Sequence, residues 1–284
     1  MNVAPVSAQG RDEDMAADTD KLALITGGSS GLGYEMARQL RAQGYGLILL
    51  ARDRLKLERA RQSLLAGGEG PPVHVVSCDL ADDVAVERAF VDVRALCQRI
   101  DFLILNAGVA SIELVEDYPS LAAVTGNLRA NLLGAVATTH LALPLLSAGS
   151  RILFVSSGFA FVGPAGYTLY ATAKAGLNVF ADGLRRELLR RKIAVHVTCP
   201  GDIDTPMYQG ELRTMPDWIR AKMGRAKPMP ADKAALYILE RCFRGRYMIV
   251  PSADVRLLIA IQSLLPRWLS MRLIDRILPL PPGS

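Results

Sequence analysis

The sequence predicts a single-domain α/β protein with a doubly wound parallel sheet of about seven strands and helices on both faces. Predicted strands and helices alternate at least six times along the chain. The strands are nearly continuous hydrophobic runs, as expected for a parallel sheet covered on both faces. A chain of 284 residues, 50% of them hydrophobic, is long enough for one core of about 250 residues.

The seven predicted strands are short apolar runs that end in turn residues. They lie at 22–26, 46–52, 73–80, 101–108, 151–157, 193–201 and 246–251. The segments between them have helical character, and several end at glycine. These predicted helices lie at 34–44, 55–68, 82–98, 123–146, 170–191 and 231–245.

The two ends of the chain differ from the predicted catalytic domain, residues 21–252. Residues 1–20 are polar and acidic and lack both a basic start and an apolar run. They predict a disordered acidic tail that is neither a signal peptide nor an anchor. Residues 253–284, here called the C-terminal segment, predict an amphipathic element.

Composition excludes several classes of function. The net charge of +5 is diffuse and accompanies no arginine-rich motif, so we expect no nucleic-acid partner. The four cysteines have no metal-ligand or CxxC spacing, so we expect reduced thiols, no metal and a cytoplasmic location.

The first predicted strand runs into a glycine-rich turn, "TGGSSGLG", that opens the first helix. Gly27 and Gly31 permit a tight turn and close approach of a ligand, while Gly33 lets the helix pack on the sheet. The helix N-terminus then presents free N–H groups to a pyrophosphate. The predicted cofactor-binding residues of this turn are Thr26, Gly27, Ser29, Ser30, Gly31, Leu32 and Gly33.

The end of the second strand predicts which dinucleotide binds. An acidic residue there selects NAD by binding the ribose 2′-hydroxyl. Here Ala51 stands at that position and Arg52 follows, and a guanidinium can hold a 2′-phosphate. We therefore expect NADP(H), although Asp53 directly after Arg52 leaves NAD(H) open.

The stretch "YTLYATAKAGL" carries two tyrosines and one lysine among small residues. Tyr170 and Lys174 are four residues apart and share one face of a helix, whereas Tyr167 lies seven residues before the lysine. A nearby ammonium lowers the pKa of a phenol, which favours Tyr170 as an acid/base. Taken alone, the pair also fits a core tyrosine beside a surface lysine.

The order of several motifs resembles that of the short-chain dehydrogenase/reductase family of single-domain Rossmann enzymes. The resemblance covers about residues 21–250. Its motifs are the glycine turn, "NAG" at 106–108, Asn131, "SS" at 156–157, "YATAK" at 170–174 and "PG" at 200–201.

The resemblance implies a role for each catalytic residue. Tyr170 would be the acid/base, and Lys174 would lower its pKa and hold the nicotinamide ribose. Ser157 would polarise the substrate carbonyl, with Ser156 the less suitable of the pair, and Asn131 would hold a proton-relaying water. The further cofactor contacts that it implies are Asp79, Leu80, Asn106, Ala107, Gly108, Pro200, Gly201 and Thr205. The implied enzyme is an NADP-dependent oxidoreductase acting on CH–OH and C=O groups.

The segment after the sixth strand is expected to form a mobile lid over the substrate, or to pack in the core. Its apolar side chains are candidate substrate contacts, together with Ser157. They are Met207, Tyr208, Met215 and Trp218.

The C-terminal segment is too short to span a bilayer, because its longest uncharged run is about ten residues. Leu269, Leu273, Ile274 and Ile277 can share one helical face, and arginines recur near Trp268. This pattern predicts contact with a membrane interface, on the cytosolic face. The alternative is a helix that closes the active site or a subunit interface.

Two stretches, 154–177 and 200–219, are most similar to the 3-ketodihydrosphingosine reductase branch of the family. This similarity implies NADPH-dependent reduction of a long-chain amino ketone in sphingolipid metabolism. The alternatives are another apolar ketone or alcohol (steroid, retinoid, fatty acyl ketone), a 3-oxoacyl carrier-protein reductase, or a non-catalytic NADP(H)-binding or scaffold protein. The predicted long helices at 121–146 and 169–191 also suggest a homodimer or homotetramer.

Overall fold

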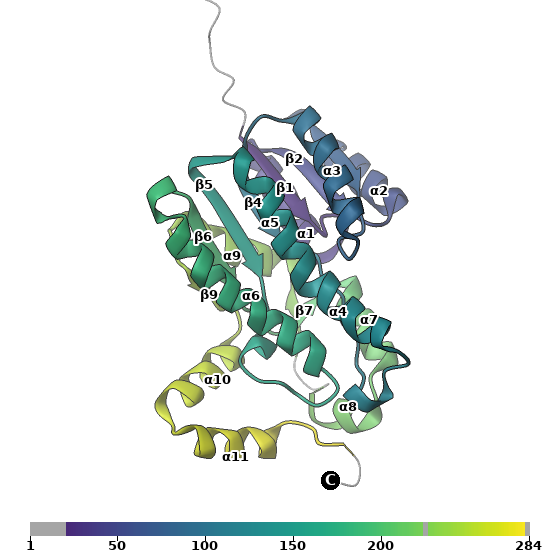
Figure 1. Ribbon diagram of the computed structural model, residues 1–284, viewed down its shortest axis with the longest axis vertical. Helices are drawn as coiled ribbons and strands as arrows, with labels where there is room; N and C mark the ends of the chain where they lie inside the picture. The colour runs from purple at the N-terminus through teal and green to yellow at the C-terminus, as the bar shows by residue number, and fades with distance from the viewer. Residues whose placement is uncertain (1–20, 224–226, 282–284) are drawn as a thin grey trace, which may run out of the picture.

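The computed structural model describes residues 21–223 and 227–281 and shows a seven-stranded sheet between two layers of helices (Figure 1). The strand order is β3-β2-β1-β4-β5-β6-β9, and every pair is parallel. The strands are β1 (Leu22–Thr26), β2 (Gly46–Ala51), β3 (Val73–Ser77), β4 (Ile100–Leu105), β5 (Leu146–Val155), β6 (Ala194–Thr198) and β9 (Met248–Ile249). The doubly wound sheet predicted from the sequence is therefore confirmed.

The helices follow the strands and cover both faces of the sheet. They are α1 (Gly31–Ala42), α2 (Arg54–Leu65), α3 (Asp83–Leu96), α4 (Leu121–Leu128), α5 (Gly134–Ala142), α6 (Thr168–Glu187), α7 (Pro206–Thr214), α8 (Asp217–Met223), α9 (Ala231–Phe243), α10 (Ala253–Leu264) and α11 (Arg267–Ile277). Buried side chains of α3, α5 and α6 pack on one face, and those of α1, α2 and α9 on the other.

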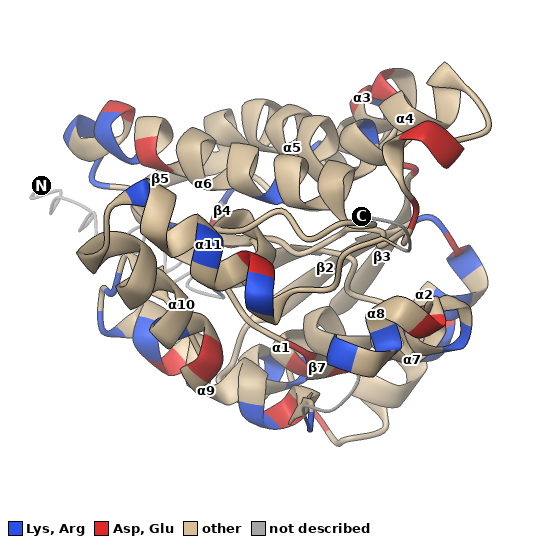
Figure 2. Ribbon diagram, turned by 90° about the horizontal axis from the view of Figure 1, so that it is seen from below, with Lys and Arg blue, Asp and Glu red and all other residues tan. Residues whose placement is uncertain are grey.

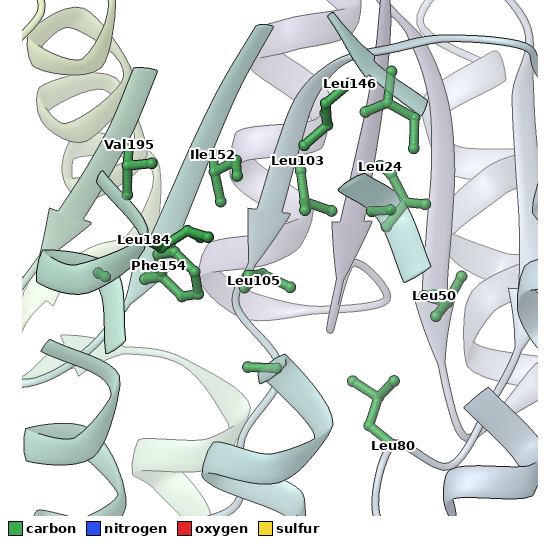
Figure 3. Close-up of a cluster of buried hydrophobic side chains, with 14 of the residues drawn as sticks. Leu24, Leu50, Leu80, Leu103, Leu105, Leu146, Ile152, Phe154, Leu184 and Val195 are labelled. Atoms are coloured by element: carbon green, nitrogen blue, oxygen red, sulfur yellow. The ribbon is translucent and has the colours of Figure 1, made fainter. Parts of the chain in front are cut away.

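The core depends on the alternation of side chains along each strand. Leu24, Leu103 and Ile152 come from neighbouring strands and belong to the cluster on one face of the sheet, where Leu184 of α6 packs near Phe154 (Figure 3). Their neighbours in sequence, such as Ile25 and Leu153, belong to the cluster on the opposite face. Because both faces are buried, each strand is apolar throughout.

The order in which strands are added to the sheet reverses between β1 and β4. These two strands are paired in parallel although β2 and β3 intervene in sequence. One half of the sheet grows outward from β1 and the other from β4. Ligands of doubly wound sheets bind at the carboxyl ends of the strands at such a point. The fold therefore places the site where "TGGSSGLG" and "NAG" end their strands.

The predicted helix at 123–146 is not continuous. A π-helical turn, Arg129–Leu133, separates α4 from α5, and a 3-10 turn, Leu143–Leu145, ends α5. Pro144 fits this ending, because proline cannot donate the helical hydrogen bond. The fifth strand also begins earlier than predicted, with Ile100 opposite Leu146 before a shift in register.

Two further features lie beyond the predicted core. The lid segment forms α7 and α8 and is tied to the body by a small parallel sheet of β7 (Ile203–Asp204) and β8 (Met229–Pro230). The C-terminal segment forms α10 and α11, drawn in yellow in Figure 1. The predicted disordered tail, residues 1–20, lies outside the described residues. No helix in the described part of the chain is long and apolar enough to cross a membrane.

Candidate active site

A cavity of about 720 Å³ lies at the carboxyl ends of the central strands. The glycine turn and the end of β2 line one end of it, and α7 and the C-terminal segment line the other. The site residues predicted from sequence are thus brought together around one space, apart from the exceptions given below.

The glycine turn has the backbone shape that only glycine adopts readily. Gly27 and Gly31 have φ values of +66° and +56°. A Cβ atom on Gly33 would lie 2.4 Å from the Gly27 carbonyl oxygen, so α1 packs directly on the turn. Ser30 is the N-cap residue of α1, but its hydroxyl forms no capping hydrogen bond. The N-terminus of α1 lies at the cavity, where its first N–H groups can bind a ligand.

Thr26 and Gly33 do not line the cavity, so their contact with the cofactor stays a prediction. Thr26 is 1% exposed, and its hydroxyl accepts hydrogen bonds from the N–H groups of Asn106 and Ala107, both at 3.0 Å. The Asn106 amide donates in turn to the Thr26 and Gly27 carbonyls at 3.2 Å. These bonds hold the loop after β4 against the glycine turn. Thr26 therefore positions residues that line the cavity without lining it itself.

At the end of β2, Arg52 and Asp53 have different surroundings. Asp53 caps α2, since its carboxylate accepts from the Lys56 N–H at 3.0 Å and lies 3.8 Å from the Lys56 ammonium. The Arg52 side chain lines the cavity and forms no ion pair among residues 21–223 and 227–281. Lys56 also lines the cavity, which the sequence analysis missed. The sequence signal for this role was its place in the first turn of α2, four residues after Arg52.

Most of the other predicted cofactor residues also line the cavity. They are Ser29, Ser30, Gly31, Leu32, Asp79, Leu80, Asn106, Ala107, Gly108, Pro200, Gly201 and Thr205. Two of them show why the loops hold their shape. The Gly201 N–H donates to the Ser252 hydroxyl at 2.9 Å, and Thr205 caps α7 by accepting from the Tyr208 N–H at 3.2 Å.

Tyr170, Lys174 and Ser157 meet near the middle of the cavity. Tyr170 and Lys174 lie on one face of α6, with the ammonium 5.5 Å from the centre of the phenol ring. The ammonium donates to the Val155 carbonyl at 2.9 Å, and burial lowers the pKa of Lys174 to about 8. Lys174 is therefore mainly protonated at neutral pH.

The two serines after β5 have separate functions. Ser156 is 2% exposed and donates its hydroxyl to the Lys174 carbonyl at 3.0 Å, which anchors α6 to the sheet. Ser157 caps the following 3-10 turn, and its hydroxyl is close enough to Tyr170 to lower the pKa of the phenol. The geometry therefore favours Ser157 as the group beside the phenol.

The pKa of Tyr170 differs from the expectation drawn from Lys174. Burial raises the pKa well above 10, the negative charge of Glu211 raises it further, and the nearby Ser157 hydroxyl lowers it in part. Desolvation opposes formation of the phenolate and outweighs the attraction of a cation 5.5 Å from the ring. Tyr170 is thus a protonated phenol at neutral pH, which suits a proton donor.

Tyr167 lies just before α6 and is 2% exposed. Its hydroxyl donates to the Glu211 carboxylate at 3.3 Å rather than to Ser157 or Lys174. Its pKa is raised well above the usual range by burial and by Glu211. Of the two phenols, only Tyr170 contacts the lysine and the serine.

Asn131 lies in the π-helical turn and is fully buried, outside the cavity lining. Its side chain exchanges hydrogen bonds with the backbone of Val109, accepting from the N–H and donating to the carbonyl, both at 2.9 Å. It also donates to Asn127. These bonds engage the amide with protein atoms, so the side chain positions the loop after β4, and its water-holding role stays a prediction. π-Helical turns are common at functional sites.

Of the predicted substrate contacts, Met207 and Tyr208 line the cavity but Met215 and Trp218 do not. Met215 is buried in a small cluster with Tyr167 and Ile219, and Trp218 packs against that cluster. Both residues therefore pack within the protein in this structure, and their contact with substrate stays a prediction.

Sequence reasoning missed the contribution of Glu211 to the cavity, and it gave closure of the active site by the C-terminal segment as the alternative to membrane contact. The segment contributes Val255, Leu258, Ile261, Leu273 and Ile274 to its wall. A Cβ atom on Gly158 would lie 2.6 Å from Val255, so α10 packs directly on the loop that carries Ser157. The apolar face of α11 predicts burial, but only the fold shows that this face lines the cavity.

The doubly wound sheet and the glycine turn at its switch point define a class, the nucleotide-binding α/β proteins. Residues 21–216 match the family described as short chain dehydrogenase. The chain belongs to this family, and it is an oxidoreductase acting on CH–OH and C=O groups.

Two relatives and one solved structure indicate the range of similar proteins. The chain is 31% identical to carbonyl reductase family member 4 of Danio rerio, over 84% of this chain and 99% of that protein. It is 30% identical to a 3-ketodihydrosphingosine reductase of Cryptococcus neoformans, over 81% of this chain and 70% of that protein. A short chain dehydrogenase of Burkholderia cenocepacia, solved in complex with NADP, is similar with a TM-score of 0.70 and 29% identity, covering 81% and 95% of the two chains.

Proposed function

We propose that the protein is an NADPH-dependent reductase of a long-chain, lipid-like ketone, with 3-ketodihydrosphingosine as substrate and dihydrosphingosine as product. The observation that carries this proposal is the shape of the cavity. It continues from Ser157 and Tyr170 into an apolar space walled by α10 and α11. A long hydrocarbon chain would fill this space, and the similarity to a 3-ketodihydrosphingosine reductase supports the choice.

The preference for NADP(H) rests on the end of β2. Arg52 and Lys56 bring two positive charges to the cavity, while Asp53 is engaged as the cap of α2. The serine hydroxyls of the glycine turn lie on the same cavity. These groups suit a 2′-phosphate, and the N-terminus of α1 suits the pyrophosphate.

In the proposed reaction, NADPH, when bound, would supply the hydride that reduces the ketone carbon. Ser157 and Tyr170 donate hydrogen bonds to the carbonyl oxygen as negative charge grows there, and Tyr170 gives up its proton. Lys174, mainly protonated at neutral pH, helps to stabilise the phenolate that remains. The reverse oxidation uses the same groups.

We also propose membrane contact, but through a different face of α11 from the one that the sequence suggested. Leu273 and Ile274 line the cavity, so that apolar face is turned inward. The outward face carries Trp268, 61% exposed, and Met271, 41% exposed. Arg267 precedes Trp268 and Arg272 follows Met271, and Figure 2 shows basic residues along α11. Basic and aromatic side chains together suit an anionic membrane surface, here its cytosolic face.

A turnover assay tests the substrate proposal. Full-length protein with NADPH should reduce 3-ketodihydrosphingosine with a higher kcat/KM than a steroid ketone, retinal or a 3-oxoacyl carrier protein. NADH serves as the cofactor control. A higher kcat/KM for one of the other ketones would identify that ketone as the better substrate and contradict the proposal. No turnover of any of them would favour a non-catalytic NADP(H)-binding protein.

A further inference from the structure

Glu211 lies on α7 and lines the cavity beside the two tyrosines. Its carboxylate accepts a hydrogen bond at 3.3 Å from the hydroxyl of Tyr167. The rings of Tyr167 and Tyr170 are 6.5 Å apart and meet edge to face. The Glu211 charge also raises the pKa of Tyr170, and both residues line the same cavity.

Among the described residues, no cation forms an ion pair with the Glu211 carboxylate. Lys174 directs its ammonium to the Val155 carbonyl, and Lys222 directs its own to the Leu278 carbonyl at 2.9 Å. The other cations on the cavity, Arg52 and Lys56, belong to the opposite end.

Two further carboxylates strengthen the negative potential at this end. Asp202 follows β6, Asp254 begins α10, and both line the cavity. Asp202 raises the pKa of Glu211, and Asp254 raises the pKa of Asp202. The apolar walls thus enclose acidic groups that form no ion pair among the described residues, and a cationic ligand would stabilise their charged forms.

We propose that Glu211 is a specificity-determining residue that binds a protonated amine carried next to the carbonyl of the substrate. The inference rests on the proposed function, because it assumes that Ser157 and Tyr170 hold the carbonyl oxygen. An amine on the neighbouring carbon then lies within reach of a carboxylate beside Tyr170. The substrate class is a long-chain 2-amino ketone rather than a simple ketone.

The test compares Glu211→Gln with the wild type on two ketones of equal chain length, a long-chain 2-amino-3-ketone and the same ketone without the amine. Losing a hydrogen bond to a charged group corresponds to roughly 10- to 150-fold. We expect kcat/KM for the amino ketone to fall by that factor, mainly through KM. The value for the ketone without an amine should change little.

Asp217→Asn is the matched control, because Asp217 is exposed on the neighbouring helix α8 and does not line the cavity. It should leave both ketones unaffected. Equal losses on both ketones in Glu211→Gln would overturn the inference, since they would indicate that Glu211 acts only through Tyr167. Unchanged kinetics on both would overturn it as well.

A binding measurement separates this inference from the proposed function. In the presence of NADP+, a long-chain 2-amino alcohol should bind the wild type more tightly than the alcohol without an amine, and Glu211→Gln should remove the difference. If neither ketone is turned over, the proposed function fails. The binding of the two alcohols would still show whether Glu211 binds an amine. Equal binding of the two alcohols by the wild type would overturn it.

Discussion

Tyr170 and Tyr167 are three residues apart, yet their hydroxyls have different partners. Tyr170→Phe removes the proposed proton donor, so turnover should fall by at least about 10²-fold. Tyr167→Phe removes one hydrogen bond to Glu211 and should cost only about 2- to 10-fold. The measurement is kcat for NADPH oxidation, with NADPH binding as the control for folding. A larger loss in Tyr167→Phe would reverse the assignment.

Arg52 provides the second prediction at this scale. Arg52→Ala should raise KM for NADPH by roughly 10- to 150-fold and leave KM for NADH nearly unchanged, because only the 2′-phosphate contact is lost. The matched control is Arg59→Ala, which removes an exposed arginine of α2 outside the cavity. A wild-type preference for NADH would contradict the prediction.

At the scale of elements, the strands and the glycine turn were predictable because they depend on local patterns. A run such as "LILL" is apolar whichever helix covers it, and Gly27 needs a positive φ that the sequence itself indicates. The pairing of Tyr170 with Lys174 followed from helical spacing alone.

Other elements depend on tertiary contacts and were therefore missed. The π-helical turn at Arg129–Leu133 coincides with the bonds of Asn131 to the loop after β4, which no helical period reveals. The strands β7 and β8 contain two residues each and form only because the lid segment returns beside β6. The apolar face of α11 was recognised, but its position against the cavity requires the fold.

The outward face of α11 leads to a prediction about the whole element. Replacing Trp268 and Met271 with serine should release the protein from anionic liposomes, because both side chains are exposed beside arginines. Salt should weaken the binding of the wild type without abolishing it, since apolar burial adds to the charge attraction. Co-sedimentation measures the effect.

Leu236→Ser is the control, because Leu236 is 51% exposed on α9 and belongs to a different surface. It should not affect binding to liposomes. Wild-type protein that stays in the supernatant at low salt would contradict membrane docking, and the C-terminal segment would then serve only as the wall of the cavity.

At the scale of the molecule, exposed apolar side chains gather on α4, α6 and the turn between α4 and α5. Leu121 is 77% exposed, Leu133 45% and Val179 72%. We expect these helices to pair in a homodimer that could assemble further into a tetramer. Val179→Arg should yield monomers in light scattering, because it would bury a charge at the interface.

Val91→Arg is the control for the oligomer, since Val91 is 62% exposed on α3. It should leave the molecular mass unchanged. A monomeric wild type would contradict the prediction.

The Glu211 carboxyl group, which forms no ion pair with any described residue, affects how the stability of the molecule responds to pH. Burial raises its pKa from 4.5 to about 7, so the folded protein holds a proton that the unfolded chain releases. The free energy of unfolding should therefore decrease as pH rises from about 4.5 to about 7, by up to the order of 3 kcal/mol. Above pH 7, Glu211→Gln should melt at a higher temperature than the wild type, and near pH 4 the two should melt together. A lower melting temperature of the variant at pH 8 would show that the carboxylate supports the fold. In the expected case, the buried charge of Glu211 destabilises the free protein above pH 7. Binding of the protonated amine would then raise the melting temperature.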